Sequence, residues 1–171
     1  MDDAYNHPAA WPVERLLAEC QTTRSRRSGP GGQHRNKVET AVGILHRATG
    51  LAGNASERRS QAENRQRAIF RLRVKLAIEH RCDVAAGQAP SGLWRSRCRN
   101  GQIRVNPRHE DYPAVLAEVL DRIAADGYEH QSAAEVLECS GSHLVKLIKA
   151  EPAALVWVNQ QRAARGLHAL R

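Results

Sequence analysis

Aromatic residues and long apolar runs are scarce in this chain of 171 residues. One Phe, three Trp and three Tyr make up 4% of the sequence, so a core must be built mainly from aliphatic side chains. A chain of this length buries roughly 70% of its unfolded surface on folding, which is enough for a core without covalent crosslinks. The N-terminal stretch carries acids early, and no stretch approaches the roughly 20 apolar residues of a membrane span. We therefore expect no membrane partner and a cytoplasmic location.

Cysteine and histidine are present, but neither has the spacing of a functional cluster. No pair of cysteines shows the short separation that is typical of a zinc site or a redox motif. The eight histidines are scattered along the chain. The sequence therefore predicts no metal site, no cofactor, and reduced, buried thiols at Cys20, Cys82, Cys98 and Cys139.

Positive charge is abundant and unevenly distributed. Residues 24–75 hold 13 Lys and Arg against three acids, a net charge of +10. Residues 109–154 hold three Lys and Arg against nine acids, a net charge of −6. Because clustered cations release condensed counterions from nucleic acid, the first segment is suited to binding phosphate.

Strands are expected early in the chain. Residues 21–27, rich in Thr and in alternating cations, fit an exposed strand that follows a short helix opened by Pro12. Residues 38–50 suggest a turn of helix leading into a strand, and residues 51–55 a second strand after a Thr-Gly hairpin signal.

A long helix is expected to follow this strand pair. Ser56 is its predicted N-cap, because Ser accepts a hydrogen bond from the first free amides of a helix. Ile69, Leu72 and Leu76 recur at helical spacing, which predicts the buried face. Another face carries three cations four residues apart: Arg67, Arg71 and Lys75.

The second half of the chain is patterned for helices. Residues 85–92 are small and fit a linker, and Asn100-Gly101 is a hairpin signal because both residues accept positive φ. Beyond Pro113 an apolar stripe predicts a helix that Gly127 ends, and Pro152 opens a last helix. Between them, apolar spacing resembles a helix-turn-helix core, with Ser140 or Ser142 as cap of the second helix; its apolar members are Ala133, Ala134, Leu137, Cys139, Leu144 and Leu147.

The stretch "SGPGGQHRNK", residues 28–37, combines a backbone of unusual freedom with a dense set of cations. Gly31 and Gly32 have no Cβ, so these residue types permit backbone conformations that are closed to other residues and a close approach to a substrate. A loop of this composition is typical of a crowded site that handles phosphate-rich ligands.

Three ordered elements carry a specific resemblance. "RRSGPGGQHRNKVETAV", then "RATG", then "ERRSQAENRQRA" resemble the Gly-Gly-Gln domain of class I peptide release factors and of the related ribosome-rescue peptidyl-tRNA hydrolases. The similarity covers roughly residues 20–80, about a third of the chain. It implies a ribosome-dependent hydrolase of the peptidyl-tRNA ester, with large-subunit rRNA and P-site peptidyl-tRNA as partners. Since only about 20 residues precede the first predicted strand, we expect release that does not depend on a codon.

The resemblance also assigns the residues of the site. It implies that the Gln33 N–H donates to the developing oxyanion while the Gln33 side chain places the attacking water, and that a glutamine methyltransferase modifies Gln33. The implied catalytic residues are Gly31, Gly32 and Gln33. The implied RNA-binding residues are Arg26, Arg27, Ser28, His34, Arg35, Asn36, Lys37, Arg58, Arg59, Ser60, Gln61, Asn64 and Arg65.

The expected fold is α+β. A small Gly-Gly-Gln domain over residues 1–84, in which a few-stranded sheet packs on a long helix, is followed by a basic linker or hairpin over 85–112 and a helical domain over 113–171 with the helix-turn-helix pattern.

Simpler interpretations stay open beside the resemblance. Asn36 and Lys37 fit loop scaffolding as well as phosphate contact. The residues from Arg58 to Arg65 fit a solvated start of a helix as well as contact with rRNA or bracing of the loop. His34 lacks the Ser/Asp or Cys/Asn partners of a general base. The alternative function is a non-catalytic RNA- or DNA-binding protein that uses the helix-turn-helix pattern.

Overall fold

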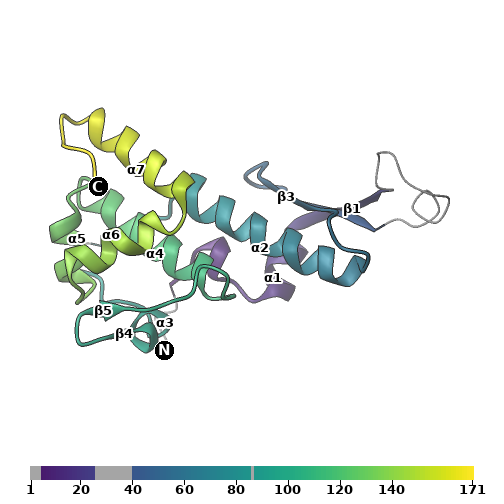
Figure 1. The fold of residues 1–171 in the computed structure, drawn as a ribbon, viewed down its shortest axis with the longest axis horizontal. Coiled ribbons are helices and arrows are strands. Elements are labelled where there is room, and N and C mark those ends of the chain that lie inside the picture. The colour runs from purple at the N-terminus through teal and green to yellow at the C-terminus, as the bar shows by residue number, and fades with distance from the viewer. Residues whose placement is uncertain (1–4, 26–39, 86) are drawn as a thin grey trace. The chain divides into compact units, whose positions relative to one another are not determined.

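The computed structural model describes residues 5–25, 40–85 and 87–171 as a mixed α+β fold, as expected from the sequence (Figure 1). The chain divides into two compact units. One, Trp11–Leu76, is called the sheet unit below. The other joins Met1–Ala10 to Ala77–Arg171 and is called the helical unit.

The sheet unit contains a three-stranded antiparallel sheet and a long helix alongside it (Figure 1). The central strand β2 pairs with β1 from Cys20↔His46 to Ser25↔Ala41 and with β3 from Val42↔Ala55 to Leu45↔Ala52. In chain order the elements are α1 (Val13–Ala18), β1 (Cys20–Ser25), β2 (Ala41–His46), β3 (Ala52–Ala55) and α2 (Gln61–Glu79), and α2 continues into the helical unit.

Alternation along β2 explains which face of the sheet meets the helix. Val42, Ile44 and His46 are buried, while the residues between them are half-buried, which is the period of two expected of a strand with one covered face. The predicted face of α2 is buried as expected, at Ile69, Leu72 and Leu76.

Gly53 of β3 sets how closely the sheet approaches α2. A Cβ at this position would overlap the carbonyl oxygen of Ala68 and lie 2.6 Å from the amide nitrogen of Leu72. Both are backbone atoms of α2, so no side-chain rotation relieves the overlap. Only glycine therefore permits this spacing between strand and helix.

The predicted N-cap of the long helix is wrong. Helix α2 begins at Gln61 rather than after Ser56, and the Glu63 N–H donates to Ser60 Oγ at 3.3 Å. Ser56 lies in an irregular stretch in which its own N–H donates to the Glu57 carboxylate at 2.9 Å. Ser56 and Ser60 are equally good N-caps by residue type. Hydrogen bonds between the side chains of Glu57 and Asn64 and the backbone of residues 56–58 decide between the two serines.

The helical unit contains short helices, one hairpin and a central helix. Its elements are η1 (Pro8–Ala10), α3 (Gly92–Arg97), β4 (Cys98–Arg99), β5 (Gln102–Ile103), α4 (Tyr112–Ala125), α5 (His130–Val136), α6 (Gly141–Lys149) and α7 (Pro152–Ala163). The predicted hairpin, the opening of α7 at Pro152 and the end of α4 before Gly127, whose φ is +65°, are all present. Helix α3 was not predicted; Ser91 caps it by accepting from the Trp94 N–H at 3.0 Å.

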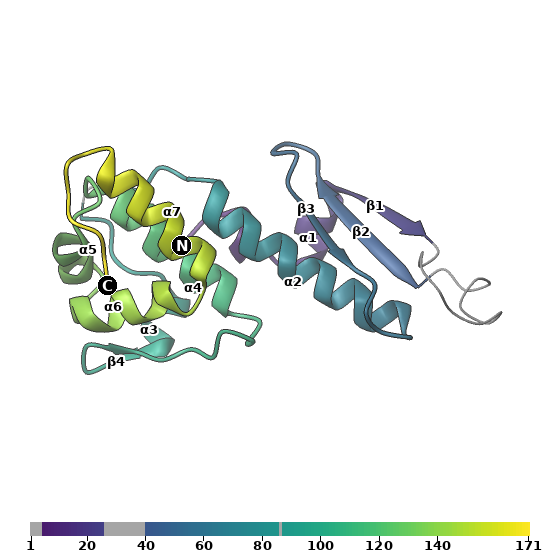
Figure 2. The same cartoon turned by 45° about the horizontal axis from the view of Figure 1, so that its top comes forward.

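Helix α4 is buried on every side, not along one stripe as its pattern predicts (Figure 2). Each residue from Tyr112 to Ile123 is buried, including the ionisable Glu118, Asp121 and Arg122. The segment 5–10, through η1, and the helices α5 and α6 all pack against α4. The sequence pattern marked one covered face, and the other faces are covered by segments distant in the chain.

Helices α5 and α6 form the predicted helix-turn-helix arrangement. The predicted apolar residues are buried except Cys139, which is half-buried. Ser140 caps α6, as expected, by accepting from the His143 N–H at 3.4 Å. In the turn Glu138 takes a φ of +52°, the left-handed conformation that glycine adopts most easily.

The four cysteines are unpaired, as predicted, although only Cys20 is fully buried. Across the described parts of the chain, no helix has the length and apolar character needed to cross a membrane.

Candidate catalytic loop and nucleic-acid interface

The Gly-Gly-Gln segment is carried between two paired strands. Strand β1 ends at Ser25 and β2 begins at Ala41, and these two residues are opposite each other in the antiparallel register. The segment that connects them therefore starts and finishes on neighbouring strands of the sheet. The predicted residues that fall outside the described part of the chain are Arg26, Arg27, Ser28, Gly31, Gly32, Gln33, His34, Arg35, Asn36 and Lys37.

Asn64 joins the start of α2 to the residue beside this segment. Its side chain is fully buried, and its Nδ2 donates to the Thr40 carbonyl at 2.7 Å and to the Arg58 carbonyl at 2.9 Å. Its Oδ1 accepts from the Arg58 N–H at 2.9 Å. Its side chain thus makes three hydrogen bonds inside the protein, one of them to the residue that precedes β2.

The other described residues of the predicted interface lie around the start of α2. Arg58, Arg59, Ser60 and Arg65 are exposed, and Gln61 is half-buried. Within the part of the chain that the structure describes, no ion pair neutralises Arg58, Arg59 or Arg65. Three cations next to the N-terminal end of a helix make a surface suited to phosphate.

Glu57 is a charged residue that sequence reasoning missed. Its carboxylate pairs with Arg67 at 2.9 Å and with Arg71 at 2.7 Å. The hydrogen bond from Arg67, with backbone N–H groups of Ser56 and Glu57, holds the pKa of the Glu57 carboxyl at about 2. Two of the three cations in the predicted stripe on α2 are therefore partly neutralised. The signal in the sequence was a single acid among arginines, 10 and 14 residues before its partners.

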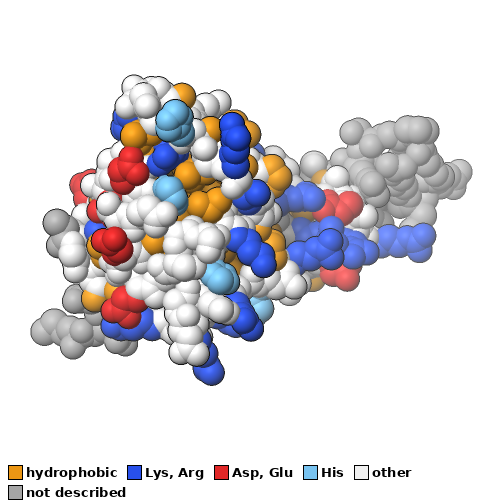
Figure 3. Space-filling model, turned by 60° about the vertical axis from the view of Figure 1, so that its left-hand side comes forward, with side chains coloured by type: hydrophobic (Ala, Val, Ile, Leu, Met, Phe, Trp, Pro, Cys, Tyr) orange, Lys and Arg blue, Asp and Glu red, His pale blue; other side chains and the backbone are white. Residues whose placement is uncertain are grey.

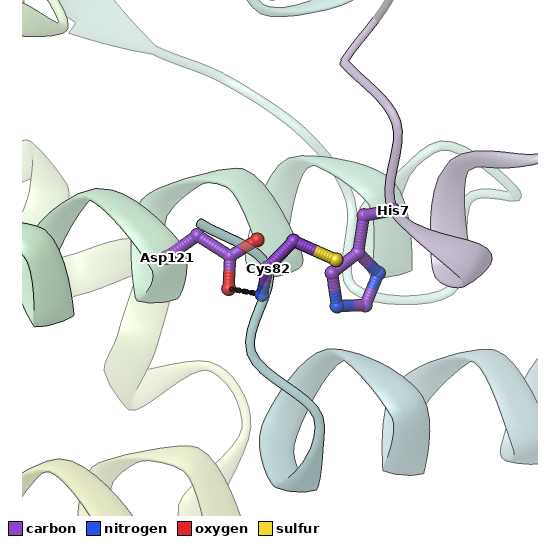
Figure 4. Close-up of side chains that lie close together, drawn as sticks. All are labelled: His7, Cys82 and Asp121. Carbon is purple, nitrogen blue, oxygen red and sulfur yellow. Dashed lines mark hydrogen bonds between the residues drawn. The ribbon is translucent and has the colours of Figure 1, made fainter. Parts of the chain in front are cut away.

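A group of metal-ligating residue types lies in the helical unit. His7, Cys82 and Asp121 bring one ligand atom each to within 4.8 Å of one another (Figure 4). Burial raises the pKa of the Cys82 thiol to about 11 and lowers the pKa of His7 to about 3, so the pair holds a neutral thiol and a neutral ring.

The candidate ligand atoms of His7 and Asp121 are already engaged in hydrogen bonds. His7 Nδ1 accepts from the Ala9 N–H at 3.0 Å, and Nε2 lies 3.2 Å from the His80 carbonyl, to which a neutral ring donates. The Asp121 carboxylate accepts from the Cys82 N–H at 3.2 Å, as Figure 4 shows. Because a neutral imidazole has one lone pair, His7 has none left for an ion. Hydrogen bonds from the Tyr5 hydroxyl to Asp121 and from His7 to the His80 carbonyl fasten the N-terminal segment to α4 and to the residue after α2.

The fold and the loop sequence together define an α+β domain that presents a Gly-Gly-Gln segment between two strands. The chain belongs to the family described as the RF-1 domain, whose sequence profile matches residues 13–110.

Curated proteins similar to this chain are named as release factors. Peptide chain release factor 1 of Acidiphilium cryptum (strain JF-5) is 48% identical over 98 residues, which is 57% of this chain and 26% of that protein. Peptide chain release factor PrfB1, chloroplastic, of Arabidopsis thaliana is 43% identical over 82 residues, 44% of this chain and 18% of that protein. The chain thus matches about a quarter or less of the length of these relatives. No solved structure matches it.

Proposed function

We propose that this protein hydrolyses the ester of peptidyl-tRNA in the peptidyl-transferase centre of the ribosome, without reading a codon. One observation carries the proposal: the Gly31-Gly32-Gln33 sequence lies between the paired strands β1 and β2 of an RF-1 domain. The named release factors support a role in translation termination, and the cations beside the loop support an RNA-lined site.

In the proposed reaction water attacks the ester carbonyl that links the nascent peptide to tRNA. The carbon–oxygen bond to the tRNA breaks, the peptide leaves as a carboxylic acid, and the tRNA hydroxyl takes up a proton. The backbone N–H of Gln33 donates to the oxyanion that forms during attack, and the Gln33 side chain places the water. Because Gln33 is neither nucleophile nor base, ribosomal RNA and the tRNA complete the site.

The loop needs both freedom and anchorage for this task. Gly32 gives the backbone before Gln33 conformations that a Cβ would exclude. The ladder from Cys20↔His46 to Ser25↔Ala41 and the Asn64 bond to Thr40 fix the ends of the segment on the sheet. A side-chain methylation of Gln33 by a glutamine methyltransferase is part of the proposal, on the resemblance of the loop alone.

The test compares Gly32→Ala with Gln33→Ala in single-turnover release of labelled peptide from stalled ribosomes. Gly32→Ala moves the donor, and loss of one oxyanion donor lowers the rate by roughly 10² to 10³. Gln33→Ala keeps the backbone donor, so we expect a smaller loss or a changed preference between water and other nucleophiles. Ribosome binding, which depends on the cations, should change little in either variant.

Two outcomes would overturn the proposed hydrolysis, and a third would overturn its independence of a codon. One is wild-type protein that binds ribosomes and releases nothing, which favours the non-catalytic RNA-binding alternative. The other is a Gly32→Ala variant that releases at the wild-type rate. Ribosomes stalled on a sense codon and on a stop codon should be equally good substrates, and dependence on the stop codon would contradict codon independence.

A further inference from the structure

The hairpin of the helical unit lies in a locally basic stretch of a unit whose other residues are acidic on balance. The helical unit has 12 Lys and Arg against 13 acids, a net charge of −1. Within it, residues 95–108 hold five arginines and no acid. The proposed hydrolysis makes no use of this charge.

The hairpin places arginines on one face. Cys98 pairs with Ile103 and Arg99 with Gln102, and the Arg104 N–H extends the ladder by donating to the Arg97 carbonyl at 3.0 Å. Because side chains alternate along a strand, Ile103 faces the unit and is buried, and the alternate residues share the opposite face. That outer face carries Arg97, Arg99, Gln102 and Arg104.

The hairpin is held firmly in this orientation. Asn100 and Gly101 at its turn have φ values of +51° and +71°, as a tight two-residue turn requires. The Gly101 carbonyl accepts from the Ser140 N–H at 2.9 Å, and the indole of Trp94 donates to the Leu137 carbonyl at 2.8 Å. Strand β5 also packs against α6 (Figure 1). The arginines therefore stand on a scaffold tied to the helix-turn-helix.

The outer face of the hairpin encloses a hollow with unneutralised positive charge. An open depression of about 540 Å³ is lined by Ser96, Arg97, Arg99, Asn100, Gln102 and Arg104. Arg97 is committed to Asp111, to which its Nε donates at 2.9 Å. Arg99 and Arg104 are exposed, and neither forms an ion pair within the residues that the structure describes. The lining has no aliphatic or aromatic side chain.

We propose that this arginine face of the hairpin binds the sugar-phosphate backbone of double-helical RNA. Guanidinium groups match phosphate geometrically, and the neighbouring Asn, Gln and Ser side chains hydrogen-bond to hydroxyls and phosphates. A-form RNA offers a wide, shallow minor groove with 2′-hydroxyls, which suits a hairpin whose strands are two residues long. The lack of apolar lining disfavours a membrane or an apolar peptide. Figure 3 shows Lys and Arg side chains at several places on one face, alongside acidic ones.

The test measures the affinity of the full chain for a short RNA duplex over a range of salt. We expect Arg99→Gln/Arg104→Gln to lower the steepness of log affinity against log salt by about 1.4 to 1.8, because each lost phosphate contact removes about 0.7 to 0.9. Between 50 and 200 mM salt the wild type should therefore lose about tenfold more affinity than this variant. Cations of the sheet unit, whose net charge is +9, also bind RNA, so the readout is the difference between the wild-type and variant curves.

The matched control is Lys146→Gln/Lys149→Gln, which removes two exposed charges from α6 in the same unit. This control should keep the wild-type slope, and all variants should keep the wild-type far-ultraviolet circular dichroism. An equal slope change in the control, or none in the arginine variant, overturns the proposal. So does equal affinity for a DNA duplex of the same length, or tighter binding of poly-glutamate, which would indicate an acidic protein partner. Because the assay contains no ribosome, its result is separate from that of the hydrolysis test.

Discussion

The sheet unit and the helical unit differ in where they keep their charged side chains. The sheet unit has a net charge of +9, from 14 Lys and Arg against five acids, and its Glu57 pairs with Arg67 and Arg71 at the surface. The helical unit buries Glu118, Asp121 and Arg122 in its central helix. The net charge of a segment therefore does not give the charge of its surface.

The buried charges of α4 are matched by internal partners. Glu118 accepts from the Ser91 N–H at 2.7 Å and from the Ser91 hydroxyl at 2.6 Å. Arg122 donates to the carbonyls of Ala85 and Gln88 at 3.1 and 3.3 Å. Two of the nine acids in residues 109–154, Glu118 and Asp121, are therefore buried and add nothing to the surface, and the exposed hairpin before this segment is basic. The number of acids in the segment thus does not show that its surface repels nucleic acid.

The largest expected effect on stability comes from Asp121→Ala, which removes a buried charge. Glu57→Ala, which removes an exposed charge, is measured beside it for comparison. Asp121 accepts from Arg81 at 2.8 Å, from the Cys82 N–H and from the Tyr5 hydroxyl, so Asp121→Ala leaves buried donors without a partner. We expect a loss of about 3 to 5 kcal/mol in the free energy of unfolding, measured by urea denaturation. Glu57→Ala should cost less than about 1 kcal/mol, because its partners are exposed. Equal losses would contradict the comparison between the units.

The next effect tests how tightly the sheet unit is packed. Gly53→Ala places a Cβ against the backbone of α2, and we expect a loss of about 1 to 3 kcal/mol. Gly43→Ala is the control: its Cβ would meet Thr23 Oγ1 at 2.7 Å and Asn54 Oδ1 at 2.8 Å, which are ends of exposed side chains. Moving Thr23 costs only its long hydrogen bond to the Gly43 carbonyl, at 3.4 Å. Urea denaturation of both variants ranks them. A Gly53→Ala variant as stable as Gly43→Ala would mean that α2 shifts at little cost.

A smaller effect is expected from the neutral polar group that the sheet unit does bury. Asn64→Ala removes the partner of the Arg58 N–H and of the Thr40 carbonyl, and the expected loss is about 2 kcal/mol. Gln66→Ala, an exposed position on α2, should leave stability unchanged. If Asn64 braces the catalytic segment, its variant also releases peptide more slowly while ribosome affinity holds. Normal release from a destabilised variant would restrict Asn64 to a role in folding.

The smallest effect concerns pH, to which buried charges in the helical unit respond in opposite senses. His7, with its pKa lowered to about 3, stabilises the fold above pH 6.5 and loses that contribution as pH falls toward 3. Burial raises the pKa of Asp121 to about 6, so its contribution is complete below pH 3.8 and is lost as pH rises through 6. The contributions oppose each other between about pH 6 and 4, and only the loss from His7 continues below that range.

We therefore expect the stability of the helical unit to change by only about 1 kcal/mol between pH 6 and 4 and to fall below pH 4. Urea denaturation at stepped pH, followed through Trp fluorescence and circular dichroism, measures this profile. A steep loss between pH 6 and 5 would show that His7 is not balanced by Asp121. In Asp121→Asn the flat region should become a decline.

Local signals in the sequence predicted the parts of the fold that are decided locally. Asn100-Gly101 predicted the hairpin, Pro152 predicted the start of α7, Gly127 predicted the end of α4, and Ser140 was a predicted cap of α6. Each of these residues acts on atoms only a few residues away. Ser56 failed as a cap because Asn64 and Glu57 hold the residues before α2 in another conformation. The neutralisation of Arg67 and Arg71 was missed because their partner Glu57 lies 10 and 14 residues before them in the chain.

The buried side of α4 could not be predicted from its own pattern. Its ionisable residues are of the types that usually face solvent. The long-range hydrogen-bond partners of these residues, which make their burial possible, lie 27 to 116 residues away in the chain. At the candidate site the motif residues remain predictions from residue type and order, while the hydrogen bond from Asn64 to Thr40 depends on where Thr40 lies in the folded chain. The sequence shows the arginines of the hairpin as a basic stretch. The hollow that they line could not be predicted without knowing which residues of the two strands pair.

The helical unit is interrupted in sequence by the sheet unit, and this has a consequence for the order of events during synthesis. Residues 11–76 leave the ribosome as one continuous stretch, so the sheet unit can fold as soon as it has emerged. Tyr5, made earlier, must remain without its partner Asp121 while 116 further residues are added. At about 5 to 20 residues per second this interval lasts roughly 6 to 22 seconds. A protein proposed to act on stalled ribosomes thus leaves its own first residues exposed when its synthesis pauses before α4.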